Sequence, residues 1–151
     1  MQLNISTDYA IRIILYLAKN KQVVSSGKLS KVIRVSPRYL LQIGARLRDA
    51  DLIATVYGPT GGYSLTKSPE QINLYDIITV MEGKTQLRQQ PVPESDNLQE
   101  FIALNSVYKY MENNMEQSLR SITIERLLSQ PVDELSIIFK TGSHNETKQL
   151  Y

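Results

Sequence analysis

The 151-residue sequence contains no cysteine, and it has a single histidine, His144. The absence of cysteine excludes disulfides, thiolate zinc sites, cysteine nucleophiles and iron–sulfur clusters ligated by this chain. His144 stands in a polar tail with no metal-ligand spacing around it. No pair of carboxylates lies in apolar surroundings that would tune an acid–base dyad. We therefore expect a protein that is not an enzyme and that holds no metal or cofactor.

Long apolar runs and a visible targeting segment are also missing. The longest apolar run, from Ile13 to Ala18, is far shorter than the about 20 residues that a membrane span needs. The first residues show no basic leader followed by an apolar core, which is the pattern of a signal peptide. The expectation is a cytoplasmic protein without a membrane partner.

Charge is divided unevenly along the chain, although the overall net charge is only +2. Residues 1–67 hold ten Lys and Arg against three Asp, whereas residues 68–151 hold seven bases against twelve acids. A basic half joined to an acidic half favours a polyanion-binding module beside a part with another task. A basic surface that is merely solvated fits the charge alone equally well.

Capping residues and apolar periodicity predict two helices in the first 35 residues. Ser6 or Thr7 is expected to cap a largely buried helix, because apolar residues cover a broad face of the segment that follows. Ser25 or Ser26 is expected to begin a second, short helix. One face of that helix is predicted to carry Leu29, Val32 and Ile33.

A third helix is predicted after Ser36, which is followed by a proline at the first helical position. Its apolar residues recur at the spacing of a buried stripe: Leu40, Ile43, Gly44 and Leu47. The opposite side of the helix carries Arg38, Gln42, Ala45 and Asp49, flanked by Leu41 and Arg46.

A β-hairpin and a fourth helix complete the first 83 residues. The segment from Ile53 to Val56 is typical of a strand, Tyr63 to Leu65 of its return, and the glycine-rich residues between them of a turn. Asn73 is expected to cap a helix that ends at Gly83. This order predicts a mainly α fold with a small β-hairpin wing, in which residues 1–83 form a winged helix-turn-helix domain.

The rest of the chain is expected to hold a linker, a dimerisation region and a tail. Residues 84–97 are polar and contain two prolines, residues 98–130 return to a helical period, and residues 131–151 form the C-terminal tail. Ser121 is expected to cap a short final helix. The long helix carries a heptad stripe that favours a homodimer over an intramolecular core: Phe101, Leu104, Tyr108, Met111, Met115 and Leu119.

The exposed face of the third helix is the part of a helix-turn-helix that enters the major groove of double-stranded DNA. Arginine pairs with guanine and glutamine with adenine, which makes Arg38 and Gln42 candidate base readers. Lysines of the second helix and backbone N–H groups of the wing would contact phosphates. The alternative for each side chain is a merely solvated residue. The predicted DNA contacts are Ser36, Arg38, Tyr39, Gln42, Arg46, Lys28, Lys31, Tyr57, Gly58, Thr60, Gly61 and Gly62.

Several of these segments together resemble the Rrf2 family of bacterial transcription regulators. The similarity lies in Thr7-Asp8-Tyr9-Ala10 with Arg12, in Ser36 with Tyr39-Leu40, and in Gly58-Pro59 followed by Gly61-Gly62-Tyr63. The resemblance implies a dimeric winged-helix repressor or activator whose long helices cross between subunits.

Two departures from the family pattern change what the resemblance implies. Cluster-binding members carry three cysteines in the loop before the long helix, and here residues 86–94 contain none. Cluster-based sensing is therefore not carried over. The wing position where such regulators place an arginine is occupied by Tyr57.

The sequence thus predicts a homodimeric, sequence-specific DNA-binding transcription regulator that acts as a repressor. It is expected to bind a pseudo-palindromic operator without an iron–sulfur cluster. The alternative is a protein-interaction module whose basic face docks an acidic protein. A small organic ligand or a protein partner is the expected effector, acting at the junction from Lys84 to Asn97. A constitutive DNA binder in which this loop is only a linker is the other possibility.

Overall fold

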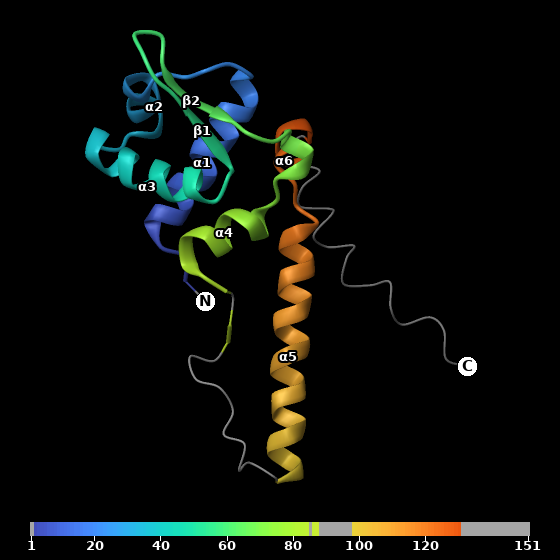
Figure 1. Cartoon of the computed structure of the whole chain (residues 1–151). Coiled ribbons are helices and arrows are strands. Elements are labelled where there is room, and N and C mark those ends of the chain that lie inside the picture. Colours follow the sequence, from blue (N-terminus) through green and yellow to red (C-terminus); the bar gives the residue numbers. More distant parts are fainter. Residues whose placement is uncertain (1, 85, 88–97, 131–151) are drawn as a thin grey trace.

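A computed structural model of the chain describes residues 2–84, 86–87 and 98–130 (Figure 1). The elements follow the order α1 (Ile5–Asn20), α2 (Ser26–Ile33), α3 (Pro37–Asp49), β1 (Ile53–Val56), β2 (Gly62–Leu65), the 3₁₀ turn η1 (Pro69–Gln71), α4 (Leu74–Glu82), α5 (Gln99–Arg120) and α6 (Ile124–Ser129). The predicted fold class, mainly α with a β-hairpin wing, is confirmed. Residues 131–151, with His144, and most of the expected 84–97 linker lie outside the described residues.

Three of the predicted helix starts are capped as expected. The hydroxyl of Ser25 accepts a hydrogen bond from the backbone N–H of Lys28 at 3.2 Å, and Ser36 does the same for Tyr39 at 3.2 Å. The side-chain oxygen of Asn73 accepts from the N–H of Asp76 at 3.0 Å. These bonds satisfy amide groups that a helix leaves without internal partners.

Two other predicted caps are wrong. The N-cap of α1 is Asn4 rather than Ser6 or Thr7, because the Thr7 hydroxyl donates to the carboxylate of Glu82 instead. The final helix begins after Thr123, whose hydroxyl accepts from the N–H of Arg126 at 3.1 Å. Ser121 lies before it and donates to the carbonyl oxygen of Ser118 in the last turn of α5.

The core is built around α1, which passes through the middle of the winged domain (Figure 1). The buried stripe predicted on α3, from Leu40 to Leu47, packs into this core. On α2 the structure corrects the expectation, because Val32 is 47% exposed. Ser30 takes the inner side of that helix, where its hydroxyl donates to the carbonyl oxygen of Val35 at 2.6 Å.

The wing is a two-stranded antiparallel hairpin that is tied to the connection between α1 and α2. Its register pairs Ile53 with Leu65 and Val56 with Gly62, and the return strand begins one residue earlier than predicted. Val24 and Tyr63 exchange two backbone hydrogen bonds of 2.8 and 2.9 Å. The ring of Tyr63, 6% exposed, reaches Gly44 of α3. The wing therefore has a defined position beside α3.

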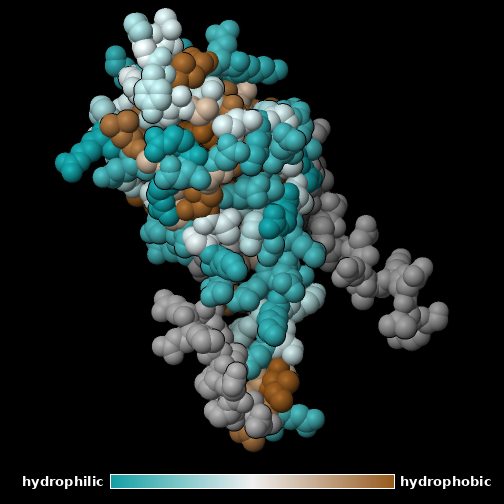
Figure 2. All heavy atoms as spheres, viewed as in Figure 1, coloured by the Kyte–Doolittle hydropathy of each residue, from teal (hydrophilic) through white to brown (hydrophobic). Residues whose placement is uncertain are grey.

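The expected dimerisation region, residues 98–130, divides into two parts. Helix α5 projects from the winged domain, and none of its 22 described residues is buried (Figure 1). Helix α6 returns to the core, where Ile124 is fully buried and its N–H donates to the carbonyl oxygen of Ile72 at 2.8 Å. Figure 2 shows hydrophobic side chains at the free, lower end of α5. No helix in the described part of the chain is long and apolar enough to cross a membrane.

Candidate nucleic-acid interface

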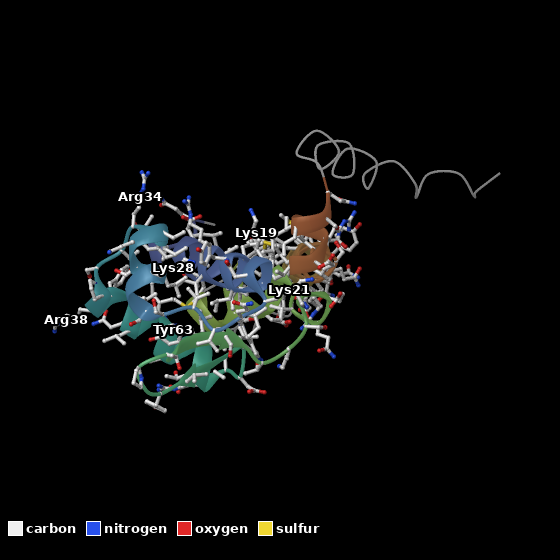
Figure 3. The ribbon with its side chains drawn as sticks, turned by 90° about the horizontal axis from the view of Figure 1, so that it is seen from above. Lys19, Lys21, Lys28, Arg34, Arg38 and Tyr63 are labelled. Atoms are coloured by element: carbon white, nitrogen blue, oxygen red, sulfur yellow. The ribbon has the colours of Figure 1, made fainter. Side chains whose placement is uncertain are left out.

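Helix α3 presents a continuous exposed face because its opposite face is fixed in the core. Arg38 and Gln42, the two predicted base readers, are both exposed and lie one helical turn apart. Side chains three or four positions apart are neighbours on a helix, so Leu41 and Ala45 belong to the same face. Figure 3 shows Arg38 extending outward from the end of α3, away from the body of the protein. We call Arg38, Leu41, Gln42 and Ala45 the outer face of α3.

One flank of α3 is held by the rest of the domain. The ring of Tyr39 packs edge-on against Tyr9 of α1, with centroids 6.0 Å apart. The guanidinium of Arg46 donates to the carbonyl oxygens of Val80 and Met81, at 2.8 and 2.9 Å. The structure thus gives both of these predicted DNA contacts partners within the fold, and Arg46 bridges α3 to the C-terminal end of α4.

Glu82 fixes the same end of α4 to the start of α1. Its carboxylate accepts hydrogen bonds from the Asn4 backbone N–H at 2.8 Å, from Asn4 Nδ2 at 2.6 Å and from the Thr7 hydroxyl. The bond from Thr7 is the main cause that lowers the pKa of Glu82, and the bonds from Asn4 and the charge of Arg46 act in the same direction. The sequence gives no sign of this arrangement, since Thr7 and Glu82 lie 75 positions apart.

The glycines of the wing tip are required by the path of the backbone. Gly58 adopts a φ of +108°, and its carbonyl oxygen accepts from the N–H of Gly61 at 3.0 Å. A Cβ added to Gly61 would lie 2.2 Å from the carbonyl oxygen of Val56, and one on Gly62 would lie 2.0 Å from that of Val24. Beside them, Tyr57 is 84% exposed. The tip therefore presents backbone and a tyrosine ring to the solvent.

A cleft joins the wing tip to the start of α2. Its volume is about 270 Å³, and it brings together Lys28, Ser25 and Thr60 from segments far apart in the sequence. Lys28 and Lys31 are both exposed on α2. Ser36 lies at the start of α3, where its hydroxyl oxygen caps the helix. The cleft thus brings predicted contacts of α2 and the wing together, whereas Arg46 is bonded to α4.

The predicted dimerisation stripe lies on α5. Phe101, Leu104 and Met111 are exposed, with 43%, 43% and 49% of their surface accessible. Tyr108, Met115 and Leu119, the other three residues of the stripe, are half-buried. The C-terminal end of α5 is attached to α4 through Arg120, which pairs with Glu116 at 2.8 Å and lies 4.0 Å above the ring of Tyr75. An apolar stripe on a projecting helix is suited to pairing with a second copy.

From the sequence alone, Leu41 is only a flank of the base-reading residues. In the structure, the Leu41 side chain is 58% exposed. Among the large apolar residues of α3, a helix that the structure describes in full, it is the only exposed one. The spacing from Arg38 to Leu41 is the sequence pattern that could have placed it on the outer face.

The chain is similar to regulators of transcription. The family model Rrf2, described as an iron-dependent transcriptional regulator, matches residues 3–130. NsrR, an HTH-type transcriptional regulator of Shouchella clausii, is 37% identical over 89 residues, which cover 58% of this chain and 60% of NsrR. CymR, an HTH-type transcriptional regulator of Bacillus subtilis, is 29% identical over 132 residues, which cover 85% of this chain and 91% of CymR.

Two solved structures agree with the fold. The structure of B. subtilis CymR, described as a global cysteine regulator, superposes with a TM-score of 0.69 and 27% identity over 85% of this chain and 97% of that one. The structure of T. potens IscR superposes with a TM-score of 0.65 and 28% identity over 85% and 86% of the two chains.

The residues of this chain do not fit an iron centre of the cysteine-ligated kind. The sequence has no cysteine, and the described residues contain no group of three or more His, Asp or Glu that could hold a metal ion. In the described part of the loop, the backbone N–H of Leu87 donates to the carboxylate of Glu112 at 2.7 Å.

Proposed function

Because the chain belongs to the Rrf2 family of transcriptional regulators, we propose that it is a DNA-binding transcription regulator that reads its operator with the outer face of α3. The observation that carries the proposal is the exposure of Arg38 and Gln42 on α3, opposite the buried stripe that fixes this helix. With α3 in the major groove, Arg38 pairs with a guanine and Gln42 with an adenine.

Backbone contacts surround this reading face. Phosphates are contacted by Lys28, Lys31 and the Ser36 hydroxyl, and also by Thr60 and the backbone of the glycine-rich tip. Such contacts set the position of the protein on the duplex and carry no sequence information. The cleft that joins Lys28 to Thr60 supports this part of the proposal, because it places a cation and a hydroxyl beside each other. We leave Arg46 out of these contacts, since its guanidinium bonds to α4.

The functional unit is a homodimer that pairs through the stripe on α5. Two copies related by a two-fold axis match a pseudo-palindromic operator with half-sites about 34–36 Å apart. We propose that the dimer works in the cytoplasm as a repressor, because protein bound to an operator excludes other proteins from that DNA. It does so without a cluster, since the chain has no cysteine to ligate one.

The effector is a small organic ligand or a protein partner that acts where α4 leads into residues 84–97. The bonds from Arg46 to the end of α4 support this placement, because they connect that junction to α3. Regulation in cells that survives replacement of residues 84–97 by an unrelated linker of equal length would contradict it.

The function is tested by selecting bound duplexes from a pool of random DNA with the purified full chain. Binding of the selected duplex should weaken with salt by about 0.9 log units per log unit of salt for each phosphate neutralised. Arg38→Ala and Gln42→Ala should each lose about 1–3 kcal/mol on the selected duplex and relax the preference at particular positions.

Lys31→Ala is the matched control, because it should weaken selected and random DNA alike and reduce the salt slope. Equal losses on both kinds of DNA for all three variants would contradict the division into base readers and phosphate contacts. Failure to enrich any sequence would favour the alternative, a basic face that docks an acidic protein.

A further inference from the structure

Leu41 occupies the outer face of α3 although it is a large apolar residue. Its side chain is 58% exposed, while Leu40 and Ile43, the nearest leucine and isoleucine on the helix, are buried in the core. Leu41 therefore contributes little to the core. It lies three positions after Arg38 and four before Ala45, so these residues adjoin it on the surface of the helix.

The position of Leu41 differs from that of Val32, an exposed apolar residue of the neighbouring helix α2. Val32 lies on α2 and is 47% exposed, whereas Leu41 lies on α3, one helical turn from Arg38, which is proposed to read a base. A helix whose outer face enters the major groove brings side chains of that face, near its N-terminal end, against base edges. Leu41 is then covered by DNA when Arg38 and Gln42 are bound.

The major groove offers one apolar group, the C5-methyl of thymine. A leucine cannot hydrogen-bond, so it would leave the donors and acceptors of the other base edges without partners and lose their hydration. The adenine that Gln42 is proposed to read is paired with a thymine, whose methyl group lies in the same groove.

We propose that Leu41 is a specificity-determining residue that contacts a thymine methyl group in each half-site. The inference rests on the proposed function and adds to it a residue and a base that the polar readers do not specify. Burial of one methyl group against a leucine favours thymine over uracil, which lacks only that group, by about fourfold.

The test replaces each thymine of the selected duplex by deoxyuridine, one position at a time, and measures binding by the full chain and by Leu41→Ala. At one thymine in each half-site, deoxyuridine should lower the affinity of the wild-type chain about fourfold. The same replacement should leave the affinity of Leu41→Ala unchanged, because this variant has already lost the contact with the methyl group. Val32→Ala is the matched control, since it removes an exposed apolar side chain outside the outer face and should show the wild-type loss.

Two results would overturn the proposal while leaving the proposed function in place. One is a selected duplex with no enriched thymine, and the other is an equal uracil penalty in the wild-type chain and in Leu41→Ala. A Leu41→Ala variant that changes oligomeric state on light scattering, with the uracil penalty intact, would show that protein covers this leucine. If no duplex is enriched at all, the proposed function itself fails.

Discussion

Two glycines of the winged domain have different surroundings. Gly27 lies inside α2, and a Cβ added there would meet nothing within 4 Å. Gly62 has a φ of +153°, and its Cβ would lie 2.0 Å from the carbonyl oxygen of Val24. At the residue scale, replacing each glycine by alanine should therefore change the free energy of unfolding in opposite directions.

Gly27→Ala should raise the free energy of unfolding by about 0.5 kcal/mol, because alanine restricts the unfolded chain and suits a helix. Gly62→Ala should lower it by roughly 2 kcal/mol, since the clash with Val24 is with backbone and the φ is strained for an L-residue. Urea denaturation of the two variants and the wild type measures both changes. A Gly62→Ala protein as stable as the wild type would show that the path of the backbone beside Val24 differs from the one described.

At the element scale, three helices meet where α4 ends. Arg46 of α3 bonds to the carbonyl oxygens of Val80 and Met81, and Glu82 bonds to Asn4 and Thr7 at the start of α1. The last carbonyl groups of a helix have no internal partners, and a cation is favourable beside them. This corner therefore sets the orientation of α3 from the flank opposite the wing.

Arg46→Met keeps the length of the side chain and removes its donors. We expect the free energy of unfolding to fall by about 1 kcal/mol and the affinity for the selected duplex to fall with it, because α3 is less firmly held. The salt dependence of binding should keep its slope, which measures the number of phosphates contacted.

Lys31→Ala is the comparison for Arg46→Met, since loss of one phosphate contact from each protomer of the dimer should reduce the slope by about 1.8. A similar reduction in Arg46→Met would mean that Arg46 contacts a phosphate, as the sequence alone suggested.

At the scale of the whole molecule, α5 carries apolar surface that remains exposed among the described residues. Leu104 and Met111 are exposed and lie seven positions apart, on one side of the helix. Ser106 and Asn113 are also exposed and seven positions apart, and the helical period places them on the other side.

Replacing Leu104 and Met111 together by Glu should give monomers, because a charge at an apolar interface loses packing and is costly to desolvate. Ser106→Glu with Asn113→Glu adds the same charge to the opposite side and should leave the dimer intact. Light scattering of both double variants decides the assignment. If the chain with Glu at positions 104 and 111 remains a dimer, the interface lies elsewhere.

The sequence by itself determined the features that depend on neighbouring residues. The caps by Ser25, Ser36 and Asn73 and the buried stripe from Leu40 to Leu47 follow from interactions within one or two helical turns. The exposure of Arg38 and Gln42 follows from that stripe, since the side opposite a buried face remains outside. The fold class and the position of the base-reading candidates could be predicted for this reason.

Only the tertiary structure decided the contacts between distant segments. Arg46 bonds to residues 34 and 35 positions away, and Glu82 to residues 75 and 78 positions away. Ile124 lies in the core of the winged domain, although the sequence assigned it to the dimerisation region. Local patterns state which side of a helix is apolar, but the partner of each side depends on how all the helices pack at once.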